Sequence, residues 1–257
     1  IYWKNSPIAK IKKGKNYLFP EIDIVADEAL NLSSKNELSI FLNSWIKNYI
    51  LDQLKDLINL SNLKNKNKYL RALTFQLYEN NGVLKRKSID EIVKSISKDE
   101  RKQFRNLGIK LGRYHIFLPK MLKPKAVEFR ISLWKLFNNL SDKNEIPRSG
   151  LNFLTNTKFD KNFLLLCGFE KFQNFFVRID ILEKLFLKII ESTNDRKFTI
   201  NAEMMNLLGC SKENFYKLMN YMDYKKDKAL DTYIFKGERK KKRKTAPLPG
   251  GLKSEGL

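Results

Sequence analysis

The stretch at residues 107–125 limits the fold most tightly, because glycine and proline interrupt a run of apolar and basic residues. It reads Leu-Gly-Ile-Lys-Leu-Gly-Arg-Tyr-His-Ile-Phe-Leu-Pro-Lys-Met-Leu-Lys-Pro-Lys, with two glycines and two prolines in nineteen residues. Glycine and proline punctuate the backbone, so one amphipathic helix cannot span this stretch. Its basic side chains alternate with aromatic rings, an arrangement that suits contact with the phosphates and bases of a nucleic acid.

The strongest helical pattern runs through residues 34–60. Apolar residues recur there every three or four positions, as in Leu38, Leu42 and Trp45, which is the spacing of one buried helix face. Ser34 with Glu37 three residues later predicts a capping box at its start. Shorter patterns predict helices near residues 70–82, 89–96, 99–107, 124–137 and 179–190.

Two regions predict other structure. Residues 1–25 are β-like around a turn at Asn5-Ser6-Pro7, and residues 168–177 are compatible with a short hairpin. Residues 202–208 and 212–222 predict two helices joined by Gly209-Cys210-Ser211, which is a helix-turn-helix pattern. A strand at 233–235 after it would give a winged-helix-like unit.

We therefore predict a mainly α fold: a helical bundle with a small N-terminal β element and a C-terminal winged-helix-like unit. The expected domains are a β element at 1–30, a helical domain at 31–140 and a helical or winged-helix-like domain at 141–235, followed by a basic tail at 236–257. The tail is rich in lysine, then in proline and glycine, and predicts disorder. No internal repeat is visible in the sequence.

The charge of the chain points to a polyanionic partner. The net charge is +22 and the isoelectric point near 9.8, which favours nucleic acid or an anionic surface. An AT-rich genome also produces abundant Lys, Asn and Ile, so composition alone leaves both explanations open. No apolar run approaches the length of about 20 residues that a membrane span needs, and we expect no membrane partner.

The cysteines and the histidine indicate no metal site. Cys167 and Cys210 lie far apart on apolar stretches, and His115 is the only histidine, so no cluster has zinc-ligand spacing. We interpret both cysteines as reduced core residues of a cytoplasmic protein. His115 has no evident catalytic partner in the sequence, and a structural role or an RNA contact both remain open.

Thirteen residues are the candidates for contact with nucleic acid. They lie in the 107–125 block, on the second helix of the helix-turn-helix and in the tail: Arg113, Tyr114, His115, Lys120, Lys123, Lys125, Lys212, Lys217, Arg239, Lys240, Lys241, Lys242 and Arg243. Two alternatives stay open: the block can be core with solvated lysines, and a winged-helix unit can serve only as a packing module. The cations of the tail, which run from Lys236 to Lys244, would add affinity without sequence choice.

The 107–125 block resembles the "G-x-Y-H-I-Y-L-P-x-L-L-K-P" block in the C-terminal region of bacterial DEAD/DEAH-box-type RNA helicases, which are related to the mitochondrial helicase that partners RNA-degrading enzymes. Further in-order matches spread over residues 1–224: 2–9, 73–84, 177–183 and 198–211 resemble the family's "W-x-G-x-P-V-A", "L-A-F-Q-L-x-E-x-x-G-V-L", "V-R-V-D-I-L-E" and "F-T-V-x-x-x-M-x-x-L-x-G-C-S". Asn5 departs from a usual glycine, and residues after Lys225 match weakly.

The resemblance implies an RNA-binding accessory region whose ATPase motor lies N-terminal to it. ATP and Mg²⁺ are then expected only for the motor, and this chain should hold no cofactor and no catalytic site. RNA or another single-stranded nucleic acid, the motor in cis and a ribonuclease are the implied partners. Because the sequence starts at Ile1 without methionine, we expect a fragment of a longer chain.

Three other classes of protein can be compared with the sequence: an ATPase motor, a nuclease and a stand-alone helix-turn-helix module. Residues 22–30 imitate the Walker B strand of a helicase with Asp27 and Glu28, but no phosphate-binding loop precedes them: Gly14-Lys15 has Ala9 where the first glycine should stand. A nuclease needs convergent acidic residues for metal ions, and the sequence offers no compelling cluster. A stand-alone helix-turn-helix module remains the alternative to a helicase accessory region.

Overall fold

A computed structural model describes residues 1–25, 31–61, 67–140, 145–155, 160–227 and 232–235. The Walker-B-like pair Asp27 and Glu28 and the cations of the tail, among them Arg239 to Arg243, lie outside the described residues. The structure is 54% helix and 21% strand, and its described strands form five small antiparallel sheets. The predicted mainly α class is therefore wrong, and the fold is mixed α and β.

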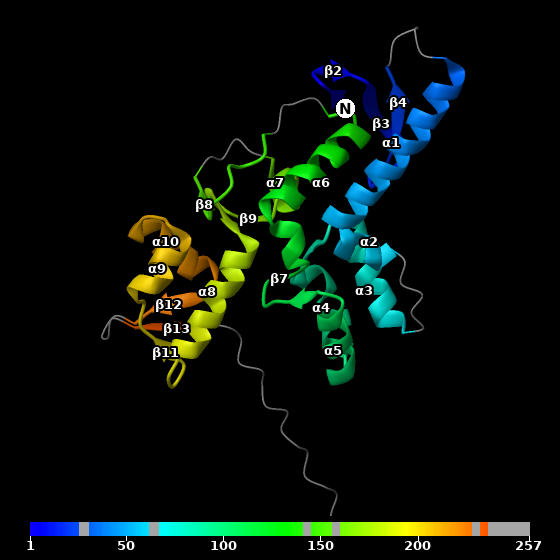
Figure 1. Cartoon of the computed structure of the whole chain (residues 1–257). Helices are drawn as coiled ribbons and strands as arrows, with labels where there is room; N and C mark the ends of the chain where they lie inside the picture. The colour runs from blue at the N-terminus through cyan, green and yellow to red at the C-terminus, as the bar shows by residue number, and fades with distance from the viewer. Residues whose placement is uncertain (26–30, 62–66, 141–144, 156–159, 228–231, 236–257) are drawn as a thin grey trace, which may run out of the picture.

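The N-terminal region consists of two hairpins and two helices (Figure 1). Its elements are β1 (Tyr2–Trp3), β2 (Ser6–Pro7), β3 (Ala9–Asn16), β4 (Phe19–Ile24), α1 (Leu32–Gln53) and α2 (Lys55–Ser61). The strand β4 of the second hairpin packs against α1. The side chain of Asn31 accepts a hydrogen bond from the backbone of Ser34 at 2.8 Å and so caps α1. The predicted cap at Ser34 is thus displaced by one turn.

The next elements make a three-stranded sheet with three short helices. They are α3 (Lys68–Glu79), β5 (Val83–Lys85), the 3₁₀ turn η1 (Arg86–Ile89), α4 (Asp90–Ser95), α5 (Lys98–Asn106), β6 (Lys110–Leu111) and β7 (His115–Phe117). The third strand pairs with both others, in the order β5-β7-β6. We call residues 68–117 unit 1.

The central elements repeat this sheet order with fewer helices. They are the 3₁₀ turn η2 (Pro119–Leu122), α6 (Pro124–Phe137), β8 (Phe153–Leu154), α7 (Lys161–Leu166), β9 (Phe169–Phe172) and β10 (Phe175–Arg178), and the sheet order is β8-β10-β9. The predicted hairpin near 168–177 is present as β9 and β10. We call residues 124–178 unit 2.

The last elements form the winged-helix-like unit. They are α8 (Ile179–Ser192), β11 (Lys197–Phe198), α9 (Ala202–Leu208), α10 (Lys212–Tyr221), β12 (Tyr224–Lys226) and β13 (Tyr233–Phe235), with the sheet order β11-β13-β12. Gly209, in the left-handed region at φ 63°, ends α9, and Ser211 caps α10. The predicted helix-turn-helix is therefore present. We call residues 179–235 unit 3.

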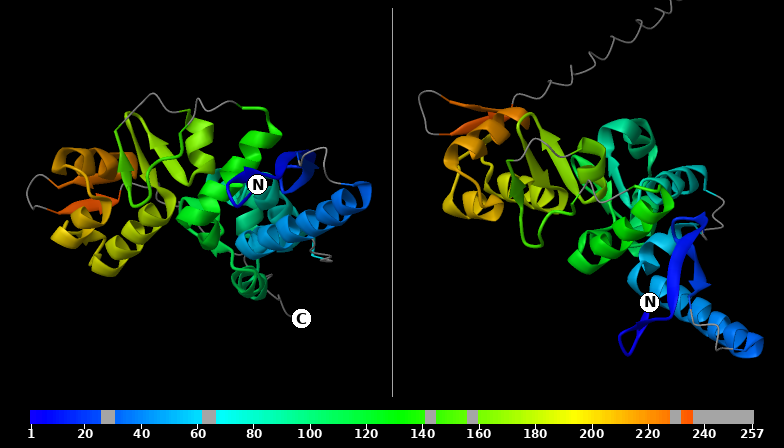
Figure 2. Two further views of the ribbon diagram at one scale, coloured as in Figure 1. Left: turned by 45° about the horizontal axis from the view of Figure 1, so that its top comes forward. Right: turned by 90° about the horizontal axis from the view of Figure 1, so that it is seen from above.

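The three units share one strand order although the sequence shows no repeat. In each sheet the first strand and the second strand flank the third, and all pairs are antiparallel. Unit 3 and α1 lie at opposite ends of the molecule, with unit 2 and unit 1 between them (Figure 2). The chain is thus a row of related units attached to an N-terminal cap.

The core follows this organisation. One buried cluster joins α1 to α6 around residues such as Leu54, Leu73 and Phe104, and another fills unit 3 around Leu182 and Phe215. The helix α6 borders the first cluster through Leu133 and a third cluster through Ile131. Because burial of apolar surface is the main stabilising term, α6 ties the cap and unit 1 to unit 2.

Candidate nucleic-acid interface

The 113–125 block is half core and half surface. His115, Ile116, Phe117 and Leu118 are buried, whereas the four basic residues Arg113, Lys120, Lys123 and Lys125 are exposed. The strand β7 carries the buried residues into the centre of the sheet of unit 1. The sequence leaves open whether this block is core or an RNA-contacting surface. In the structure its apolar residues are core, and its basic residues are surface.

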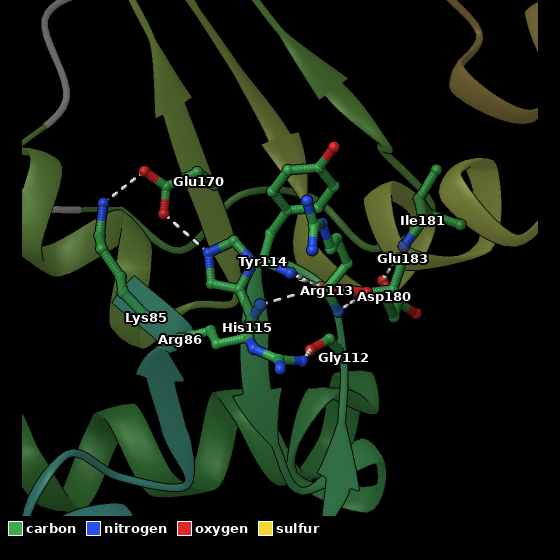
Figure 3. A network of polar contacts seen from close by, with 10 residues as sticks. All are labelled: Lys85, Arg86, Gly112, Arg113, Tyr114, His115, Glu170, Asp180, Ile181 and Glu183. Carbon is green, nitrogen blue, oxygen red and sulfur yellow. Dashed lines mark hydrogen bonds and ion pairs between the residues drawn. The ribbon is translucent and has the colours of Figure 1, made fainter. Parts of the chain in front are cut away.

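The turn before β7 is anchored on unit 3 by a buried carboxylate. Glu183 of α8 is 2% exposed and accepts hydrogen bonds from three successive backbone N–H groups, those of Arg113 at 2.7 Å, Tyr114 at 2.8 Å and His115 at 2.9 Å. A Cβ at Gly112 would lie 2.4 Å from the carboxyl carbon, so glycine is required there. Figure 3 shows this carboxylate facing the turn.

His115 belongs to a second link between units. Its Nε2 lies 2.8 Å from a carboxylate oxygen of Glu170 on β9, and Lys85 of β5 binds the other oxygen (Figure 3). Burial alone would raise the pKa of Glu170, but the hydrogen bonds from His115 and Lys85 outweigh it and hold that pKa below its ordinary value of 4.5. His115 is 2% exposed, so its ring is a structural link between units 1 and 2.

Tyr114 is also mainly structural. Its ring packs edge-on against Phe186 of α8, with centroids 5.6 Å apart, and burial raises the pKa of its hydroxyl above the ordinary value. Beside it, the exposed guanidinium of Arg113 lies 5.9 Å from the rings of both Phe186 and Phe235. Of the aromatic-basic pair expected to contact RNA, the structure exposes the arginine and covers the ring.

The three lysines of the block lie around η2 and the start of α6. Lys120 forms an ion pair with Asp56 of α2 at 3.1 Å, which partly neutralises it. Lys123 and Lys125 flank Pro124 and are exposed, and among the described residues neither makes an ion pair. Together with Arg113, these two are the exposed cations of the 113–125 block that pair with no carboxylate among the described residues.

The second helix of the helix-turn-helix presents a basic and aromatic surface. Lys212 is exposed, Lys217 is exposed but paired with Glu213 at 2.6 Å, and Tyr216 between them is 40% exposed. The Tyr216 ring stacks on Tyr233 of the β12–β13 hairpin with centroids 6.3 Å apart, and Lys226 Nζ lies 6.0 Å from its centroid. We call Lys212, Tyr216, Lys217 and Lys226 the α10 face.

Sequence reasoning missed two members of this face. Tyr216 and Lys226 were not candidates, because a tyrosine in an amphipathic helix is typical of core and a lysine before a loop is typical of solvated surface. The helical position of Tyr216, four residues after Lys212, was the signal that could have found it, since residues four apart share a helix face.

The described ranges show neither a cluster of metal-ligating side chains nor a membrane-spanning helix. Residues 1–25, 31–61, 67–140, 145–155, 160–227 and 232–235 contain no group of three His, Cys, Asp or Glu side chains that could hold a metal ion. Within the same ranges no helix is long and apolar enough to cross a membrane. Cys167 is buried and Cys210 half-buried, both are free thiols, and burial raises their pKa values to about 12 and about 11.

No family model matches the chain, and neither the curated proteins nor the solved structures contain a match to it.

Proposed function

We propose that this chain is the RNA-binding accessory region of a cytoplasmic bacterial ATP-dependent RNA helicase. It holds single-stranded or structured RNA beside a motor in cis and presents it to a ribonuclease partner. The in-order resemblance over residues 1–224 supports the helicase assignment, and the net charge of +22 supports the polyanionic ligand. ATP and Mg²⁺ belong to the motor in this proposal.

The α10 face is the observation that carries the nucleic-acid-binding part of the proposal. In a DNA-binding helix-turn-helix the second helix is the one that contacts the nucleic acid, and here that helix exposes the ring of Tyr216 together with Lys212 and Lys217. A base stacked on such a ring contributes about 1–3 kcal/mol. Lys212 and Lys226 beside the ring supply phosphate contacts, which make affinity depend on salt.

Titration of a labelled single-stranded RNA tests the proposal. We expect binding that falls by orders of magnitude between about 50 and about 200 mM salt, and an affinity about tenfold lower in Tyr216→Ala, since stacking is removed. Phe75→Ala is the matched control, because Phe75 is an exposed ring on α3, 62% accessible, outside the α10 face. Affinity that stays flat with salt, or equal decreases in both variants, would contradict the proposal.

The stand-alone helix-turn-helix module is the second candidate, and the same α10 face favours it. The genomic reading frame upstream of Ile1 separates the two functions. A frame that continues into a phosphate-binding loop supports the helicase accessory region, whereas a start codon near Ile1 supports the stand-alone module.

A further inference from the structure

Unit 1 repeats the topology of unit 3 element by element. Apart from the 3₁₀ turn η1 of unit 1, both run helix, strand, helix, helix, strand, strand, and both sheets place the third strand in the middle. The contacts between elements also correspond. In unit 3, α8 packs on α9, and α10 packs on β12, the strand that follows it. In unit 1, α3 packs on α4 in the same way, and α5 packs on β6. By topology, α5 therefore corresponds to α10.

The two corresponding helices also begin alike. Ser97 caps α5 and Ser211 caps α10, each accepting a hydrogen bond from the backbone N–H three residues later, at Glu100 and Asn214. Counted from these caps, Lys98 corresponds to Lys212, which belongs to the α10 face. Ser97, Lys98, Ser211 and Lys212 are all exposed, so the first turns of α5 and α10 both face solvent.

The exposed side of α5 is a basic row. Lys98, Lys102 and Arg105 are exposed and lie at positions i, i+4 and i+7, which places them on one helix face. Phe104 is the only buried residue of α5 and anchors its other side in the core of unit 1. We call these three cations the α5 row.

The acidic residues of α5 do not neutralise this row. Glu100 is held by the Ser97 backbone and the Asn67 side chain, which lower its pKa, and Asp99 makes no ion pair within the described residues. In that same part of the chain the α5 row makes no ion pair either, unlike Lys217 and Lys120. Three neighbouring cations without acidic partners repel one another. A phosphate bound to them would offset this repulsion.

We propose that the α5 row is a second nucleic-acid contact of this chain, separate from the α10 face, and that it binds the phosphate backbone of RNA; this inference rests on the proposed function. The deep and narrow major groove of A-form RNA does not admit a helix, so α5 contacts phosphates along its flank and reads no bases. Unit 1 adds affinity and unit 3 adds ring stacking.

The test compares two triple variants of equal charge. The first is Lys98→Gln, Lys102→Gln and Arg105→Gln on α5. The second, a matched control, is Lys10→Gln, Lys47→Gln and Lys55→Gln, three exposed lysines of the N-terminal region. The full chain is titrated with a labelled RNA hairpin that carries a single-stranded tail, and with DNA of the same sequence, at several salt concentrations, after thermal melting has verified each fold.

We expect the α5 variant to bind RNA about tenfold or more weakly and its log–log salt slope to shrink by about 2, because each phosphate that is no longer neutralised removes about 0.7–0.9. The control should change much less.

Equal decreases in affinity for RNA and DNA support binding to phosphates, and a decrease for DNA alone overturns the assignment to RNA. Equal behaviour of the two triple variants, while Tyr216→Ala still weakens binding, overturns the α5 row and leaves the proposed function standing. Wild-type chain that binds no RNA overturns both.

Discussion

Tyr114 is more buried and Tyr216 more exposed than their sequence patterns indicate. Tyr114 stands in the basic block and predicts an RNA contact, yet it packs on Phe186; Tyr216 sits in an amphipathic pattern and yet is 40% exposed. The pattern along a chain shows which residues alternate with lysines, but not which way a turn presents them. The carboxylate of Glu183, about seventy residues away, sets that direction, and no local pattern contains it.

Tyr114→Ala should therefore destabilise the fold and spare RNA binding. Removing a mostly buried ring leaves a cavity, and we expect unfolding free energy to fall by about 3 kcal/mol, near the lower end for large aromatic truncations. Urea unfolding measures this decrease, and RNA titration under native conditions measures the affinity.

Tyr216→Ala is the matched comparison and should behave in the opposite way, with weaker RNA binding and little change in stability. If Tyr114→Ala folds with normal stability and binds RNA about tenfold more weakly, Tyr114 contacts RNA and the structural role is contradicted.

Glu170 gives stability a defined dependence on pH. Its folded pKa lies below the unfolded value near 4.5, so its ionised form stabilises the fold above that pH, and the contribution is lost as pH falls through the lower folded pKa. The advantage of wild type over Glu170→Gln should be complete above pH 4.5 and should be lost as pH falls below 4.5 and through the lower folded pKa. Urea unfolding at several pH values measures this, and a constant difference would contradict it.

At the scale of elements, the long helices and the hairpin of β9 and β10 follow from the sequence, whereas several two-residue strands do not. The predicted helix at 34–60 is present, divided into α1 and α2 near Leu54, and the predicted helix-turn-helix is present as α9 and α10. The strands β6, β8 and β11 have two residues each, too few for an alternating pattern to show. Their pairing depends on distant partners, and for that reason the mainly α prediction failed.

The hairpin between β6 and β7 can be tested at Gly112. Gly112→Ala places a methyl group against the Glu183 carboxyl, at 2.4 Å without relaxation, and we expect unfolding free energy to fall by about 1–3 kcal/mol. In a Glu183→Asp background the shorter side chain leaves room, so the same change should cost less. Urea unfolding of the four chains gives the coupling; strict additivity would show that the two residues do not meet.

At the scale of the whole molecule, the repeat is in the topology and is absent from the sequence. Units 1 and 3 share a capping serine and the order of six elements, but α5 presents lysines and arginine where α10 presents a lysine and a tyrosine. Unit 2 reaches the same strand order with one helix, α7, between β8 and β9 in the described residues. Strand order depends on the pairing of distant residues, which periodicity along one chain does not record.

The basic tail gives the last prediction. Seven of its eight cations follow the last described strand closely, namely Lys236, Arg239, Lys240, Lys241, Lys242, Arg243 and Lys244. A chain ending at Phe235 keeps every interaction described above. We expect that truncation to melt like wild type but to bind RNA more weakly, with a salt slope smaller by about 0.7 for each phosphate that the tail neutralises.

A full-length chain with those seven residues replaced by glutamine is the control for tail length. It should match the truncated chain in affinity and salt slope, because the tail acts through charge and counterion release. A different outcome is that the glutamine tail binds RNA like wild type while the truncated chain binds more weakly. In that case the contribution of the tail to RNA affinity comes from its length or its other residues, and not from these seven charges. If neither change alters affinity, the RNA-binding residues lie within residues 1–235, where the α10 face and the α5 row must account for the affinity.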